Sequence, residues 1–208
     1  MADPRVTKLA QVLVNYSLNI QPGEQLVISS TPQAETLIRA VYKEAILAGA
    51  HVTVQNDIQG LREIFFKYAN EEQLNYESPV QKMFVEQFDA ELYIEADYNT
   101  RSLAGVDPVK QKIARQASAD LHKIFIERAA RGEFKWCLTV FPTNAAAQEA
   151  DMSLSEYEDF VYGAGLLHLD DPVAAWLEVA ANHKRLVGWM AGKKQVVLKG
   201  KNIDLEMS

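Results

Sequence analysis

The sequence predicts an α/β fold: a mostly parallel sheet of four to five strands flanked by helices, followed by the start of a second, β-rich region. Short apolar runs alternate with segments of helical periodicity through residues 1–194, which is typical of a parallel sheet. Five helical segments begin with a proline that follows Asp, Thr or Ser, residues that suit a helix N-cap. Residues 195–208 instead carry two strand-like runs around Gly200-Lys201-Asn202, which is a hairpin signal.

The N-terminal part predicts a helix, a strand, a helix and a strand in turn. Asp3-Pro4 opens a helix, and residues 25–30 form an apolar run typical of a strand covered on both faces. Thr31-Pro32 starts the second helix, with Thr31 as its expected cap, and residues 51–56 form the next strand. Two strands joined by a helix and short connections are expected to be parallel.

The rest of the chain continues the alternation. The middle of the chain first predicts two helices, one capped by Asp57 and one begun by Ser78-Pro79. A strand at 90–96 with one solvent-facing side follows, and then a long helical stretch from Asp107-Pro108 to about Arg131. The next expected strand is at 136–141. Thr143 is expected to cap a short helix, and Ser153 and Glu156 have the spacing of a capping box. Asp171-Pro172 opens a helix to about Ala191, whose inward apolar face would include Val173, Trp176, Leu177, Ala180, Val187 and Met190.

Composition excludes several classes of protein. The 208 residues are 48% hydrophobic and 24% charged, which is an ordinary globular mixture. A net charge of −7 argues against nucleic acid and anionic membranes as partners. The single cysteine, Cys137, excludes an internal disulfide, and no run of 18 apolar residues is present. We therefore expect a soluble protein of a reducing compartment, the cytoplasm.

No self-contained active site is evident in the sequence. The sequence lacks the glycine-rich phosphate-binding patterns and the serine-hydrolase elbow. Cys137 falls within an expected strand and is interpreted as an inert, buried thiol. The acidic residues around Glu156 are best explained as a solvated helix start. The four histidines are scattered, without the spacing of metal ligands: His51, His122, His168 and His183.

The C-terminal residues suggest a division of the chain. We expect an N-terminal α/β domain over residues 1–194, and in residues 195–208 the first hairpin of a truncated C-terminal catalytic region. A hairpin alone is marginally stable in water, and the pattern stops without a terminating turn or polar tail. Our hypothesis is that the molecule has been cut at the start of a second, β-rich region.

Several stretches resemble the aminopeptidase T and aminopeptidase S group of bacterial metallo-aminopeptidases. The resemblance runs nearly from end to end, and the stretch from Trp136 to Phe160 is its most specific part. The stretches that carry it are Trp136-Cys-Leu-Thr-Val-Phe-Pro-Thr143, Ala147-Gln-Glu-Ala-Asp-Met-Ser153, Glu156-Tyr-Glu-Asp-Phe160, Asp170-Asp-Pro-Val-Ala-Ala-Trp176, Asn19-Ile-Gln-Pro-Gly-Glu24 leading into Val27-Ile-Ser-Ser30, Val106-Asp-Pro-Val-Lys110 through Glu127-Arg128 to Gly132-Glu133, and Lys199-Gly-Lys-Asn-Ile-Asp204.

The resemblance implies an enzyme that releases N-terminal residues from peptides by means of a metal-activated water. It implies two divalent metal ions (Zn²⁺, Co²⁺ or Mg²⁺) in the full-length protein, held by residues of the family's second half. It therefore assigns no metal ligand and no catalytic residue to this chain. It further implies peptide substrates, a homodimer and no activity for this part alone.

Four residues are candidates for contact with a substrate cleft: Thr139, Phe141, Pro142 and Thr143. They lie at the end of a strand, where α/β folds usually place groups that face a ligand. The alternative interpretation, which weighs more, is that Phe141 packs, Pro142 shapes the turn and Thr143 caps a helix. For the whole chain, the alternative function is a non-catalytic binding or assembly module of α/β type.

Overall fold

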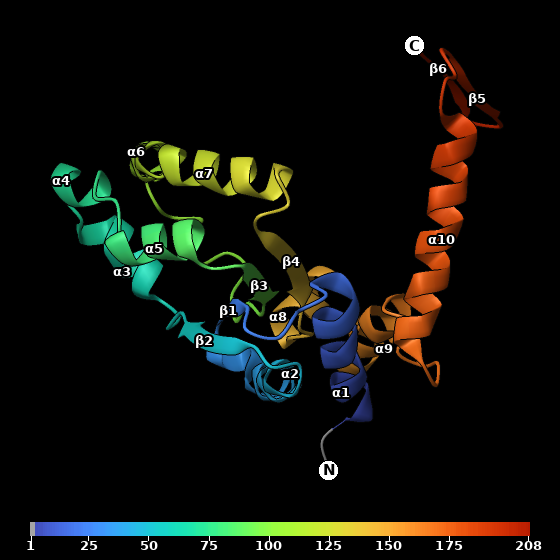
Figure 1. Ribbon diagram of the computed structural model, residues 1–208. Coiled ribbons are helices and arrows are strands. Elements are labelled where there is room, and N and C mark those ends of the chain that lie inside the picture. The colour runs from blue at the N-terminus through green and yellow to red at the C-terminus, as the bar shows by residue number, and fades with distance from the viewer. Residues whose placement is uncertain (1–2) are drawn as a thin grey trace. The chain divides into compact units, whose positions relative to one another are not determined.

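The computed structural model describes residues 3–208, and these form two compact units that comprise residues 3–173 and 174–208. Within residues 3–208, no helix combines the length and apolar character needed to cross a membrane. The larger unit contains the parallel sheet and most of the helices (Figure 1). The smaller unit consists of most of α10 (Pro172–Met190) and the strands β5 (Val196–Gly200) and β6 (Ile203–Met207).

Four parallel strands form the sheet of the larger unit, in the order β2-β1-β3-β4. This confirms the predicted fold class, with four strands rather than five. The strands are β1 (Gln25–Ser30), β2 (His51–Asn56), β3 (Ala90–Glu95) and β4 (Lys135–Val140). Because the chain passes from β1 to β2 on one side and then returns to place β3 on the other, the direction of winding reverses between β1 and β3.

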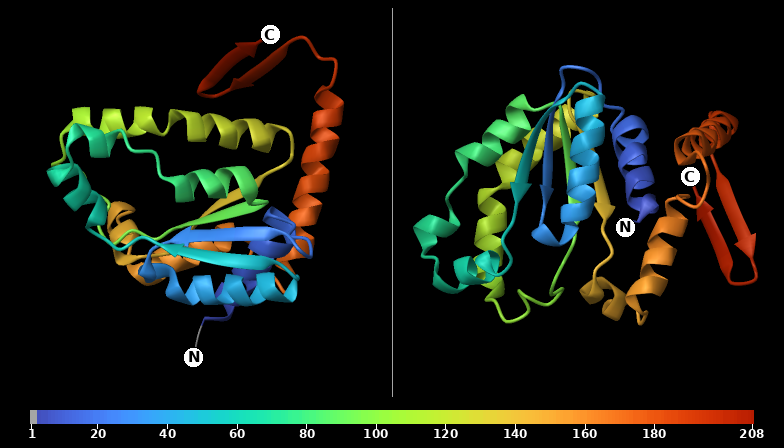
Figure 2. Two further views of the ribbon diagram at one scale, coloured as in Figure 1. Left: turned by 60° about the vertical axis from the view of Figure 1, so that its left-hand side comes forward. Right: turned by 90° about the horizontal axis from the view of Figure 1, so that it is seen from below.

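One face of the sheet is buried at its two central strands. Its side chains from β1 and β3 are apolar and buried, as Leu26, Ile28, Leu92 and Ile94 show. Helix α2 (Glu35–Leu47) lies across this side, opposite the side that carries α5 and α7 (Figure 2). The α1 helix (Pro4–Gln11) packs against α2 and continues into a π-helical segment, Val12–Ser17.

The other face lies beneath α5 (Pro79–Gln87) and α7 (Ala119–Ala130) (Figure 2). A cluster of buried Val27, Phe88 and Phe134 anchors these helices, with Phe84 and Phe125 packed against it. Further along the strands, the same face is open. Its exposed members include Tyr93 (41%), Trp136 (54%) and Leu138 (53%).

The long helical stretch predicted from residue 108 is divided in two. Helix α6 (Pro108–Ala117) ends at Ser118, and α7 follows directly. The Ser118 hydroxyl donates to the carbonyl oxygen of Ala114, 3.2 Å away. A serine hydroxyl that bonds back to the preceding turn competes with the backbone ladder and commonly bends a helix.

The prediction that Asp57 caps a helix is wrong. Helix α3 (Leu61–Tyr68) begins four residues after Asp57 and directly after Gly60, whose φ is +86°. A left-handed conformation at this point favours glycine, and it sets the start of the helix. A short helix that the sequence patterns did not predict, α4 (Glu71–Leu74), follows with Asn70 as its cap.

The other predicted caps are mostly confirmed. The expected side chains accept hydrogen bonds from backbone N–H groups at the starts of α1, α5, α6, α8 (Asn144–Glu149) and α9 (Leu154–Ala164), namely Asp3, Ser78, Asp107, Thr143 and Ser153. Thr31 is the exception, because its side chain caps neither the 3₁₀ turn Pro32–Ala34 nor α2.

The smaller unit confirms the predicted hairpin. β5 and β6 pair antiparallel, with Val196 opposite Met207 and Leu198 opposite Leu205 on one apolar face. The prediction that α10 buries an apolar face is wrong for several members of that face, because Leu177 and Val187 are 57% and 67% exposed. One helix and one two-stranded hairpin offer too little surface to bury such a face within this unit.

Candidate functional site

A hollow of about 100 Å³ lies at the carboxyl ends of β1, β2 and β3. This is the point where the winding of the sheet reverses, which is where open α/β sheets usually bind ligands. Polar and aromatic side chains dominate its lining, among them Thr31, Asp57, Arg62, Tyr93, Asp97 and Tyr98.

Two hydroxyl groups tie the strands together at this point. Ser30 donates to the carbonyl oxygen of Ile94 at 2.8 Å, and Thr31 donates to that of Ala96 at 2.7 Å. The expected capping role of Thr31 is thus replaced by a bond between the ends of β1 and β3. Because both hydroxyls are held by carbonyl oxygens, the arrangement is one of support rather than of a nucleophile beside a base.

The electrostatics of the hollow are mainly acidic. The pKa of the Tyr93 hydroxyl is raised, chiefly by burial and then by the negative charges of Asp97, Asp57 and Glu95. The guanidinium of Arg62 acts in the opposite direction. A site with this balance can hold polar or positively charged groups, and it keeps Tyr93 a neutral hydrogen-bond donor at neutral pH.

A second hollow, of about 570 Å³, adjoins the first and shares Tyr98 and Asn99 with it. Two of its lining residues form an ion pair, in which Arg101 Nε lies 3.1 Å from Glu149 Oε1 of α8. Thr100 Oγ1 donates to the same carboxylate at 2.8 Å. These contacts hold the loop after β3 against α8, so the two hollows share one structured loop.

The four predicted cleft residues lie near the end of β4 but do not line the hollow between β1 and β3. Thr139 is half-buried on β4, and the N–H of half-buried Phe141 donates to the Glu95 carbonyl oxygen at 2.8 Å. Pro142 is buried. Thr143 is buried, and its hydroxyl accepts from the Ala146 N–H at 3.2 Å. Thr143 therefore has the capping role that the sequence offered as the alternative.

Of these four residues, Thr139 contributes to a different hollow. It lines an apolar groove of about 380 Å³ between β4 and α9, with Leu138 and Phe160 among the other lining residues. Cys137, on the same strand, is half-buried, and burial raises the pKa of its thiol. The interpretation of this cysteine as unreactive is consistent with that shift.

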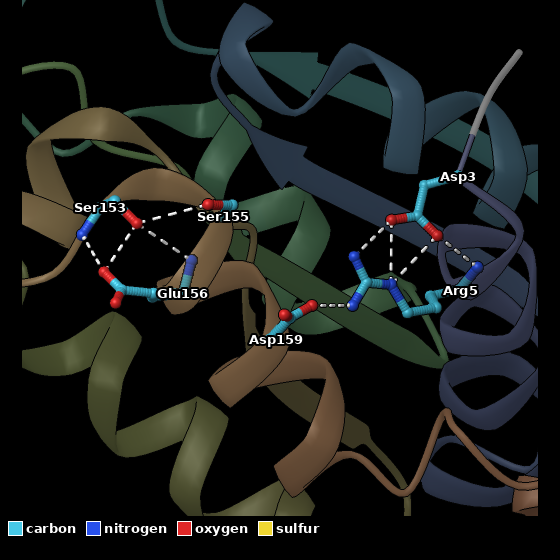
Figure 3. Close-up of polar contacts among 6 residues, drawn as sticks. All are labelled: Asp3, Arg5, Ser153, Ser155, Glu156 and Asp159. Carbon is cyan, nitrogen blue, oxygen red and sulfur yellow. Dashed lines mark hydrogen bonds and ion pairs between the residues drawn. The ribbon is translucent and has the colours of Figure 1, made fainter.

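The position of α9 beside this groove depends on Arg5 (Figure 3). The Arg5 guanidinium donates to Asp3 Oδ2 at 2.8 Å and to Asp159 Oδ1 of α9 at 2.5 Å. It also lies 4.7 Å from the centre of the Tyr162 ring. The hydrogen bond from Arg5 lowers the pKa of the Asp3 carboxyl, whereas burial raises the pKa of Tyr162 to about 12.

The start of α9 is fixed by the predicted capping box (Figure 3). The Ser153 N–H donates to Glu156 Oε2 at 2.9 Å, and the Glu156 N–H donates to Ser153 Oγ at 3.4 Å. The first hydrogen bond satisfies the cap residue and the second satisfies an otherwise unpaired N–H of the first turn. Glu156 is therefore occupied in a local structural role.

The potential metal-ligating side chains of residues 3–208 are not grouped to hold a metal ion. Within residues 3–208, no three side chains of His, Cys, Asp or Glu are placed to hold one. Asp57 and Asp97 both line the hollow between β1 and β3, but with Arg62 beside them they form no such group. The chemistry available in this hollow is hydrogen bonding and charge pairing, without an evident catalytic pair.

The hollow between β1 and β3 was not predicted from the sequence. The signal for it was indirect, because Asp57 directly follows β2 and Asp97 comes soon after β3. Acidic residues after successive parallel strands share one sheet edge, but which of them are neighbours depends on the strand order.

Comparison with known proteins gives one consistent relationship. A family model described as thermophilic metalloprotease (M29) matches residues 2–208. Aminopeptidase 2 of Geobacillus stearothermophilus is 29% identical over 209 residues, which cover 94% of this chain and 50% of that protein. The structure of wild-type AmpT from Thermus thermophilus shares the fold with a TM-score of 0.76 at 21% identity, covering 98% of this chain and 53% of that one. The chain thus spans about half the length of the relatives that it matches.

Proposed function

Because the chain belongs to the M29 family of thermophilic metalloproteases, we propose that it is the N-terminal α/β part of a metal-dependent aminopeptidase. In this proposal the complete enzyme hydrolyses the first peptide bond of peptides. The residues that hold its two divalent ions (Zn²⁺, Co²⁺ or Mg²⁺) lie outside these 208 residues. The chain itself supports the catalytic part and contributes to the wall of the substrate cleft.

The observation that carries this proposal is the extent of the family match. It covers residues 2–208, so both units of the chain take part in it. The tied ends of β1 and β3 and the loop held by Glu149 are suited to present a stable surface to a cleft.

The proposal is tested first on the chain alone. The purified chain is incubated with Co²⁺ or Zn²⁺ and aminoacyl chromogenic substrates, and its metal content is measured after dialysis. We expect no turnover and no stoichiometric metal. Peptide cleavage by the chain, or two tightly held divalent ions, would contradict the proposal.

A chimaera gives the complementary test. In aminopeptidase 2 of Geobacillus stearothermophilus, the segment that aligns with this chain is replaced by residues 2–208 of this chain. We expect the chimaera to cleave aminoacyl substrates and to lose this activity with a chelator. A folded chimaera without activity would favour the alternative, a non-catalytic binding or assembly module.

The apolar face of the hairpin is the observation that keeps this alternative open. Ile203, Leu205 and Met207 alternate along β6 and are exposed. An apolar strand face of this kind is suited to packing against another sheet or helix of a partner. We also propose that the protein forms a homodimer. Light scattering of the chain, alone and within the chimaera, measures whether these 208 residues are sufficient for dimerisation.

We further propose that the protein is located in the cytoplasm.

A further inference from the structure

A fourth hollow lies on the less covered face of the sheet, away from the groove beside α9. It measures about 360 Å³, opens to solvent, and has residues of α5 and α7 in its lining. Glu91 and Ser29 form part of its floor, and Phe84, His122 and Phe125 part of its wall. Its volume falls within the range of small-molecule sites.

Glu91 is the unusual residue in this hollow. Its side chain is half-buried, and the Ser29 hydroxyl donates a long hydrogen bond of 3.3 Å to its Oε1. No ion pair to this carboxylate occurs among residues 3–208. Burial raises the pKa of the carboxyl, which means that holding it ionised costs free energy.

The other lining residues do not supply the missing positive charge. The lining contains a second carboxylate, Asp57, and contains neither lysine nor arginine. The imidazole of His122 is stacked on Phe125, with ring centroids 6.1 Å apart and an angle of 12° between the planes. The hollow thus combines acidic groups with aromatic rings.

We propose that this hollow binds a small organic cation, an ammonium or guanidinium group that pairs with the Glu91 carboxylate while its carbon chain lies against Phe84 and Phe125. An alkyl chain that leaves water to lie against these rings gains hydrophobic free energy. A half-buried carboxylate without a countercharge carries part of the cost of burying a charge, and a bound cation would offset that cost. A small organic cation therefore matches both the acidic and the aromatic residues of the lining.

A competing interpretation is that Glu91 stays protonated and donates a hydrogen bond to a neutral ligand. The two differ in what they bind. A cation site prefers a charged ligand to its uncharged analogue of equal size, whereas a protonated acid does not. Cation binding is independent of the proposed peptidase role, because it is measured on this chain alone.

The experiment measures binding of four probes by calorimetry at pH 7.5: the n-butylammonium and N-butylguanidinium ions, n-butanol and butyrate. We expect saturable binding of both cations and none of n-butanol or butyrate. Glu91→Gln should weaken cation binding by at least about tenfold, since it removes the charge and keeps the shape. Equal binding of n-butanol, or unchanged affinity in Glu91→Gln, would overturn the inference.

The matched control is Glu95→Gln. Glu95 lies on the same strand and the same face as Glu91 but is exposed and does not line the hollow. Because the chain carries a net charge of −7, any cation is attracted weakly, and this variant measures that background. Its affinity should equal that of the wild type. An equal loss in both variants would mean non-specific attraction and would reject the site.

A second measurement protects the test if Glu91→Gln folds poorly. Amide resonances of the wild-type chain are followed during titration with n-butylammonium. We expect the largest shifts at Ser29, Glu91 and His122, and smaller ones at Thr100 and Arg101 of the second hollow. Shifts concentrated at Thr100 and Arg101 would contradict the proposal.

Discussion

The two faces of the parallel sheet differ in chemistry although the same four strands supply both. On the side of α2, alternate residues such as Leu92 and Ile94 are apolar and completely buried. The alternate residues of β3 that face the side of α5 and α7 are Glu91, Tyr93 and Glu95. One face therefore provides stability, whereas the other leaves room for ligands and relies on a few aromatic and polar contacts.

The strongest effect should come from the covered face. Leu92→Ala removes a side chain with no exposed surface and should lower the free energy of unfolding by about 2–5 kcal/mol, because it leaves a cavity. Leu138→Ala, on the other face of β4 and 53% exposed, should cost less than about 1 kcal/mol. Urea denaturation measures both. Equal losses would remove the distinction between the faces.

The next effect concerns how α7 is held over the open face. The Arg128 guanidinium donates to the carbonyl oxygens of Val85, Phe88 and Glu133 at 2.7 to 3.0 Å. Arg128→Ala leaves these acceptors without their partner and should cost about 2–3 kcal/mol. Arg128→Ala should also weaken the binding of organic cations to the hollow that contains Glu91.

The control for Arg128 is Arg131→Ala. Arg131 forms an exposed ion pair with Glu133 at 2.8 Å, and such pairs contribute little, so its loss should cost much less than the loss of Arg128. Both variants are compared by thermal unfolding. If Arg131→Ala were the more damaging change, the helix would be held by surface charge rather than by these carbonyl contacts.

Thr143 separates a structural role from a role in the cleft. Thr143→Ala removes the cap of α8 and should lower stability by about 1 kcal/mol. Thr143→Ser keeps the hydroxyl and should restore most of it. In the active chimaera, a purely structural role predicts unchanged turnover for Thr143→Ser. A fall in turnover without a fall in stability would place Thr143 in the cleft.

The weakest effect is the pH dependence due to Glu91. Its pKa is raised in the folded state, so its contribution to stability is complete below its ordinary value of 4.5 and is lost as the pH rises through the folded pKa. Glu91→Gln should therefore raise the melting temperature at pH 8 and leave it nearly unchanged at about pH 4. A variant that is less stable than the wild type at pH 8 would contradict this account.

Local structure could be predicted from neighbouring residues alone. Strand segments, the parallel βαβ start, the hairpin and the caps Asp3, Ser78 and Ser153 are encoded in short stretches, because hydrophobic period and capping act over a few positions. The same short range explains why Thr143 could be assigned a cap in advance. These signals were also enough to carry the resemblance to a family.

The joint roles of distant residues depend instead on tertiary packing. The hollow at β1 and β3 exists because the strand order is β2-β1-β3-β4, and that order depends on packing across the whole sheet. Thr31 bonds Ala96 rather than its own helix, and a partner 65 residues away cannot be inferred from local pattern. Glu91 likewise becomes a candidate ligand-binding group only where α7 covers it, since burial and charge pairing are properties of the folded molecule.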